Sequence, residues 1–135
     1  MKLVNCGKQL SVGVQQLDEQ HCKLVDIINQ LHESLKEGHG FQAIQQTLQQ
    51  LHEYTETHFQ HEEQLLEEHQ YPQLEEHRVA HQQLSQQLAQ FQLEMKAAPH
   101  ITRHHLLQFL LDWLIGHIKS EDRAYGSFLN SRGVY

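Results

Sequence analysis

Apolar residues recur every three or four positions along most of the chain, a spacing that places them on one face of an α-helix. Four stretches with this pattern are separated by glycine or proline, and they cover residues 18–37, 41–69, 72–96 and 100–129. Asp18 is a suitable N-cap for the first stretch, and Gly38 can take the left-handed conformation after its end. Pro72 can occupy the first position of the third helix, where its missing N–H costs nothing.

The connections between these predicted helices are short, so consecutive helices should run antiparallel. We predict an all-α fold, an up-down-up-down antiparallel four-helix bundle over residues 18–130, with an extended N-terminal arm over residues 1–17. The 135 residues are expected to form a single domain, 1–135, which is long enough to bury a sizeable core.

Some histidines and carboxylates interrupt the apolar stripes, where a buried polar group is costly unless it is paired. The chain has 13 histidines, and those on the stripes, with the carboxylates beside them, are His21, His58, Glu62, His77, His81, His117 and Asp122. His58 and Glu62 are four residues apart, as are His77 and His81, so each pair shares a helix face. Taken singly, each histidine is more often a partly exposed residue on a helix flank than a ligand.

Their positions along the helices favour one shared site. In an up-down bundle, the starts of the first and third helices and the ends of the second and fourth meet at one end. At about 1.5 Å rise per residue, all these side chains fall within roughly 20 Å of that end. Together, these imidazoles and carboxylates are more ligands than the four that a tetrahedral zinc ion takes. They suit two octahedral ions bridged by carboxylates, and this ligand type is compatible with iron.

The spacing of His117 and Asp122 is unusual for two residues that share a helix face. His117 and Asp122 are five residues apart, and on a regular helix they would point about 140° away from each other. If both face the core, we predict a wide turn of the π type between them, or a long reach of the Asp122 side chain. His61 could compete as a ligand, but its offset of about 300° from His58 favours a flank position.

Four segments carry a family resemblance. They are Asp18-Glu19-Gln20-His21, His58-Phe59-x-x-Glu62-Glu63, Tyr71-Pro72 with His77-x-x-x-His81, and Trp113-Leu114-x-x-His117-Ile118-x-x-x-Asp122-x-x-Tyr125. In order and spacing they closely resemble the hemerythrins, in particular the bacterial single-domain ones. The resemblance covers nearly the whole chain.

The resemblance implies two iron ions, Fe2+ or Fe3+, joined by an oxo or hydroxo group. The implied ligands are His77, His81 and His117 for one iron, His21 and His58 for the other, and Glu62 and Asp122 as bridges. The second iron is then open to dioxygen, and the implied apolar pocket at that position consists of Leu24, Phe59, Trp113, Leu114 and Ile118.

The function implied by the resemblance is reversible dioxygen binding for storage, delivery or sensing, without enzymatic turnover. One alternative is an oxygen or redox sensor that acts through a partner protein, whose identity the sequence does not indicate. A di-iron oxidase-type enzyme is the other alternative. It is disfavoured because the sequence contains no Glu-x-x-His, the pattern of oxygen-activating di-iron bundles.

Composition limits the partners further. The formal net charge is −7 at pH 7 and the basic residues do not cluster, which argues against nucleic acid. The apolar run over residues 106–118 is broken by polar residues, so no membrane span is expected. Cys6 and Cys22 form no CxxC motif, and Cys22 is interpreted as a small buried filler. We expect free thiols in a reducing compartment, with the cytoplasm as the default location.

Overall fold

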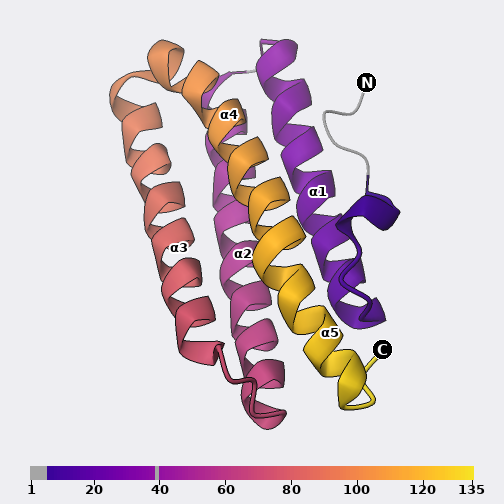
Figure 1. Ribbon diagram of the computed structural model, residues 1–135. Coiled ribbons are helices and arrows are strands. Elements are labelled where there is room, and N and C mark those ends of the chain that lie inside the picture. The colour runs from indigo at the N-terminus through magenta and orange to yellow at the C-terminus, as the bar shows by residue number, and fades with distance from the viewer. Residues whose placement is uncertain (1–5, 39) are drawn as a thin grey trace.

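The computed structural model describes residues 6–38 and 40–135, with side chains at all of these positions except 9, 41, 99–104, 107, 114, 115 and 121. Four long helical rods pack side by side and alternate in direction (Figure 1). The elements are η1 (Lys8–Leu10), α1 (Gln15–Lys36), α2 (Phe41–Glu68), α3 (Leu74–Ala97), α4 (Pro99–His117), η2 (Ile118–Asp122) and α5 (Arg123–Ser131). The predicted all-α, up-down-up-down bundle is confirmed.

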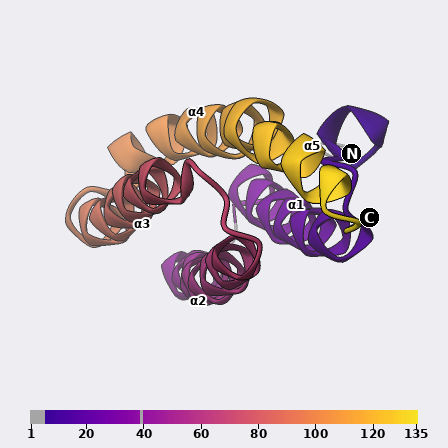
Figure 2. The ribbon, with the colours of Figure 1, turned by 60° about the horizontal axis from the view of Figure 1, so that its bottom comes forward.

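The apolar stripes of the helices meet along the bundle axis. Seen nearer end-on, the helices surround this axis (Figure 2). Neighbouring helices pack in chain order, α1 on α2, α2 on α3 and α3 on α4, and α1 also contacts α4. The fully buried side chains include Leu24, Ile28 and Leu31 of α1, Leu48 and Leu51 of α2, Leu88 and Met95 of α3, and Leu106 and Leu110 of α4. Among the described residues, no helix has both the length and the apolar character needed to cross a membrane.

The first helix begins at Gln15, earlier than predicted, because Asp18 does not act as its N-cap. The Asp18 carboxylate instead accepts a hydrogen bond of 2.6 Å from the Ser11 hydroxyl and one of 2.8 Å from the Val12 amide. Asp18 therefore holds the arm against the first turn of α1, and the boundary between arm and bundle moves from residue 18 to Gln15.

The arm is not simply extended, because it forms the short helix η1 and then packs against α5. Its side chains Leu10, Val12 and Val14 are buried. The carbonyl of Val12 lies so close to Gly126 that a Cβ at that position would overlap it, so the arm can dock here only because residue 126 is glycine. Asn130 adds a hydrogen bond of 3.0 Å from its side-chain amide to the carbonyl of Gly13.

Cys6 and Cys22 form a disulfide, so the expectation of free thiols is wrong. The arm folds back along α1 and brings their Cα atoms to 5.5 Å, within the range that a disulfide spans. Cys22 is half-buried on the face of α1 that the arm covers, and it is not a filler of the core. The argument from free thiols for a reducing compartment therefore fails.

Candidate metal centre

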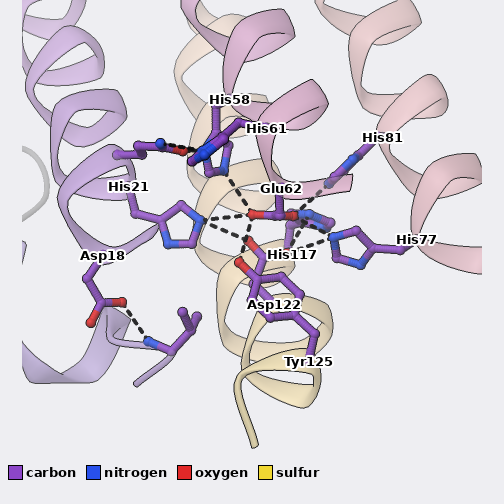
Figure 3. A network of polar contacts seen from close by, with 12 residues as sticks. Asp18, His21, His58, His61, Glu62, His77, His81, His117, Asp122 and Tyr125 are labelled. Atoms are coloured by element: carbon purple, nitrogen blue, oxygen red, sulfur yellow. Dashed lines mark hydrogen bonds and ion pairs between the residues drawn. The ribbon is translucent and has the colours of Figure 1, made fainter. Parts of the chain in front are cut away.

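Polar side chains from every long helix converge inside the bundle, at the end where α1 begins and α5 follows η2 (Figure 3). These side chains are His21 of α1, His58 and Glu62 of α2, His77 and His81 of α3, His117 at the end of α4, and Asp122 of η2. All are buried except His117, whose side chain is still only 8% exposed. The sequence-predicted candidates thus lie together, at the predicted end of the bundle.

Their possible ligand atoms fall into two groups, and within each group all atoms lie within 4.8 Å of one another. The first group consists of Glu62, His77, His81, His117 and Asp122, and the second consists of His21, His58, Glu62 and Asp122. Both carboxylates belong to both groups. This is the arrangement expected of two neighbouring cations that share two bridging carboxylates.

Each oxygen of Glu62 faces a different group. Oε1 lies 2.5 Å from Nε2 of His77 and 3.1 Å from Nε2 of His81. Oε2 lies 3.0 Å from Nε2 of His58 and 3.5 Å from Nε2 of His21. Because α2 carries Glu62 four residues after His58, one helix face places this carboxylate between the imidazoles of α1 and α3.

Asp122 is oriented in the same way by an irregular turn. Its Oδ1 lies 2.9 Å from Nε2 of His117 and 3.3 Å from Nε2 of His77, and its Oδ2 lies 3.2 Å from Nε2 of His21. The intervening segment, Ile118–Asp122, is a π-helix. The predicted wide turn is confirmed, and it lets two residues five positions apart face the same interior.

Burial and mutual attraction act against each other on the charges of the cluster. Burial alone would raise the pKa of Glu62, but the four surrounding imidazoles outweigh it and hold that pKa well below its usual range. Burial and Glu62 both act to raise the pKa of Asp122, yet His117 and His21 lower it overall. Burial likewise disfavours charge on His21, but the adjacent Asp122 and Glu62 raise its pKa to about 9.

The donor set fits a metal because protein groups alone leave part of it unsatisfied. His21 Nε2, His81 Nε2 and Asp122 Oδ1 are buried and make no hydrogen bond of acceptable geometry, although each lies near a group of opposite character. A buried polar atom without a partner costs free energy, and a cation between imidazoles and carboxylates would satisfy these atoms together. Imidazole and carboxylate are ligand types that suit iron.

Three further residues touch the cluster, and the sequence prediction assigned none of them a role. The Tyr125 hydroxyl donates a 2.7 Å hydrogen bond to Oε2 of Glu62, one turn of helix after Asp122. Gln20 and Glu63 are each next in sequence to a candidate ligand, but they contact imidazoles of other helices. Helical spacing identifies residues that share a face and gives no sign of such contacts between helices.

A small cavity adjoins the group that contains His21 and His58. Its apolar lining comes from Leu24, Phe59, Trp113 and Ile118, and its polar lining from His21, His58, His117 and Asp122. Its volume is about 10 Å³, which is roughly the room for one small molecule the size of water. The predicted pocket residues therefore meet here, except Leu114, whose side chain lies outside the described residues.

Fold and site together define a class, the four-helix bundles that present histidines from every helix around two shared carboxylates. Residues 12–129 match the family model described as the hemerythrin HHE cation binding domain. The chain belongs to the hemerythrin family.

Individual relatives agree with this assignment. The chain is 30% identical over 125 residues to the bacteriohemerythrin of Stenotrophomonas maltophilia, covering 93% of this chain and 80% of the relative. It is 29% identical over 114 residues to that of Methylococcus capsulatus, covering 84% of this chain and 86% of the relative. Crystal structures of single-residue variants of a hemerythrin superpose with a TM-score of 0.83 at 26% identity, covering 94% of this chain and 97% of the other.

Proposed function

We propose that this protein binds dioxygen reversibly at a non-haem di-iron centre. The observation that carries the proposal is that both donor groups contain Glu62 and Asp122, with one oxygen of each carboxylate facing each group. Membership of the hemerythrin family supports it, since the relatives are named bacteriohemerythrins. Such binding serves the storage, delivery or sensing of dioxygen.

In this proposal the two irons have unequal ligand sets. His77, His81 and His117 would hold one iron, and His21 and His58 would hold the other, so the second would have fewer protein ligands. Glu62 and Asp122, which belong to both donor groups, would be shared by the two irons, and an oxo or hydroxo group would complete the centre. The iron pair supplies the electrons that dioxygen binding requires. The protein fixes these ligands on the helices of the bundle, and the small cavity lies beside His21 and His58.

The cavity next to His21 and His58 is the proposed place of dioxygen. Beyond the ligands themselves, its lining is hydrocarbon and aromatic, from Leu24, Phe59 and Ile118 with the indole of Trp113. Such a wall excludes water and solvates separated charges poorly. It therefore favours release of neutral dioxygen over loss of an oxygen anion that would leave an oxidised centre behind.

The same lining supports binding rather than turnover. Apart from the proposed ligands, the described side chains that line this cavity include no carboxyl, amine or imidazole group that could transfer a proton to bound oxygen. We therefore propose that the protein is a dioxygen-binding protein and not an oxidase.

A visible absorption spectrum tests the proposal. The iron-loaded protein is reduced without oxygen, exposed to air and then evacuated, while its iron content is measured. We expect about two irons per chain and a visible band that appears in air and disappears under vacuum. One zinc ion per chain with no iron uptake, or a band that forms once and does not reverse, would contradict the proposal.

A further inference from the structure

Two of the proposed ligands turn their second ring nitrogen toward different kinds of partner. Nδ1 of His58 lies 2.7 Å from the amide oxygen Oε1 of Gln20, and Nδ1 of His81 lies 2.7 Å from the carboxylate oxygen Oε2 of Glu63. His58 belongs to the donor group beside the cavity, and His81 belongs to the other group. One group thus has a neutral partner behind its imidazole, and the other has a carboxylate.

The Gln20 side chain is oriented by a second contact. Its amide nitrogen Nε2 lies 2.7 Å from Nδ1 of His61, which lies on the α1 side of α2 (Figure 3). The amide therefore donates to His61 with its nitrogen and accepts from His58 with its oxygen. With Nδ1 of His58 carrying the hydrogen, Nε2 is the nitrogen that remains for a metal. His61 lies on the flank of α2, as predicted, outside both groups of donor atoms, and it fixes the amide that orients a proposed ligand.

Glu63 is held in a comparable way on the opposite flank of α2. Its Oε1 lies 3.5 Å from Nε of Arg78, and the Arg78 guanidinium also pairs with Glu75 at 2.6 Å and Glu67 at 3.3 Å. Arg78 follows His77 on α3, so the same helix supplies both the imidazole of His81 and the cation that anchors its carboxylate partner. Glu63 is only partly buried, with its side chain 23% exposed.

We propose that Gln20 and Glu63 are positioning residues that make the two halves of the centre electronically unequal. A carboxylate that accepts the Nδ1 hydrogen raises the basicity of a metal-bound imidazole, whereas a neutral amide fixes the ring with less effect on its donor strength. The iron held by His81 therefore has the stronger donor set and is the better stabilised when oxidised. The iron beside the cavity, held through His58, keeps the weaker set. This inference rests on the proposed di-iron function.

Exchange of the two partner types tests the inference. Glu63→Gln replaces the carboxylate behind His81 by an amide of the same shape, and Gln20→Glu makes the opposite change behind His58. Redox titration of the iron-loaded proteins measures the midpoint potentials. We expect Glu63→Gln to raise a potential and Gln20→Glu to lower one, because a weaker donor set destabilises the oxidised iron. A tenfold bias in that equilibrium corresponds to about 59 mV for one electron.

Glu67→Gln is the matched control, because Glu67 also pairs with Arg78 but has no contact with His81 among its described ones. It should leave the potentials unchanged. Shifts of the same sign in Glu63→Gln and Gln20→Glu, or no shift in either at full iron content, would overturn the inference. If one of the two variants does not hold iron, the sign of the potential shift in the other variant still supports or contradicts the inference. A wild-type protein without a reversible oxygen band would contradict the proposed function instead, which is a separate result.

Discussion

The hydroxyl of Tyr125 donates its hydrogen bond to the same Glu62 oxygen, Oε2, that faces His58 and His21. Burial raises the pKa of Tyr125 well above its usual value, and the nearby Asp122 and Glu62 raise it further. The phenol therefore stays protonated and remains a donor over the whole accessible pH range. Glu62 has in Tyr125 a partner that does not depend on metal or on the protonation of an imidazole.

Tyr125→Phe should lower the free energy of unfolding of the metal-free protein by about 2 kcal/mol, since a buried carboxylate loses a hydrogen bond. The iron content should stay at that of the wild type, because no proposed ligand is removed. Urea denaturation and elemental analysis measure the two quantities. Tyr71→Phe is the control, as its hydroxyl bonds only to the exposed Gln73 among its described contacts. Equal effects of the two substitutions would contradict the role given to Tyr125.

The stability of the metal-free protein should fall as the pH rises from 6.5 to about 9. The pKa of His21 is raised from 6.5 to about 9 in the folded chain, so the folded state binds this proton more tightly than the unfolded state. Its contribution is complete below pH 6.5 and is lost as the pH passes about 9, and it is on the order of 3 kcal/mol.

Glu62 and Asp122 act in the opposite direction, because their pKa values are lowered and their contributions are lost only in acid. Urea denaturation across this pH range checks the prediction, with His21→Gln as the variant that should show a shallower fall. Iron replaces the proton at the cluster, so the loaded protein should not show this fall. An identical pH profile for wild type and His21→Gln would count against the prediction.

Ile118→Gln separates the cavity wall from metal binding. A polar side chain at this position solvates separated charges, so the oxygenated protein should oxidise irreversibly several-fold faster while its iron content is unchanged. His77→Ala should instead lower the iron content, because it removes a proposed ligand that contacts both carboxylates. Decay of the visible band is compared with iron content for each variant. If Ile118→Gln lost iron but oxidised at the wild-type rate, the assignment of this cavity as the dioxygen site would be wrong.

Reduction of the Cys6–Cys22 disulfide should lower the free energy of unfolding by about 3 kcal/mol. The two cysteines are 16 positions apart, and a crosslink that closes a loop of this length stabilises by about that amount. Denaturation with and without a dithiol reductant measures the difference. The double variant Cys6→Ser and Cys22→Ser should match the reduced protein and not respond to reductant. A wild type that does not respond either would contradict the prediction.

The bundle and the cluster could be predicted from the sequence because both depend on helical period. His58 and Glu62, or His77 and His81, lie on one helix face by their spacing alone, and the antiparallel order of the helices then brings the pairs together. The five-residue spacing of His117 and Asp122 predicted either a wide turn or a long reach of the Asp122 side chain, and the structure has the wide turn. These features follow from helix geometry, so a single sequence is enough to predict them.

The remaining features depend on contacts between segments far apart in sequence. Asp18 resembles an N-cap, but its carboxylate accepts hydrogen bonds from the arm. The hydrophobic period likewise does not predict that the arm folds back and brings Cys6 to Cys22. Helical spacing does not predict the contacts of Gln20 and Glu63 either. Each is one residue from a candidate ligand and so points about 100° away from it on its own helix, toward a neighbouring helix.

The wide turn η2 also sets the rotational phase of everything that follows it. If Ile118–Asp122 took regular α-helical geometry without a change of length, α5 would be rotated by about 100°. Tyr125 would then turn away from Glu62, and Gly126 would turn away from the Val12 carbonyl, in the same event. The wide turn thus fixes two orientations together, that of Tyr125 beside the metal centre and that of Gly126 beneath the arm. The geometry of this turn is therefore constrained twice, once by the side chains inside the bundle and once by the arm that packs on α5.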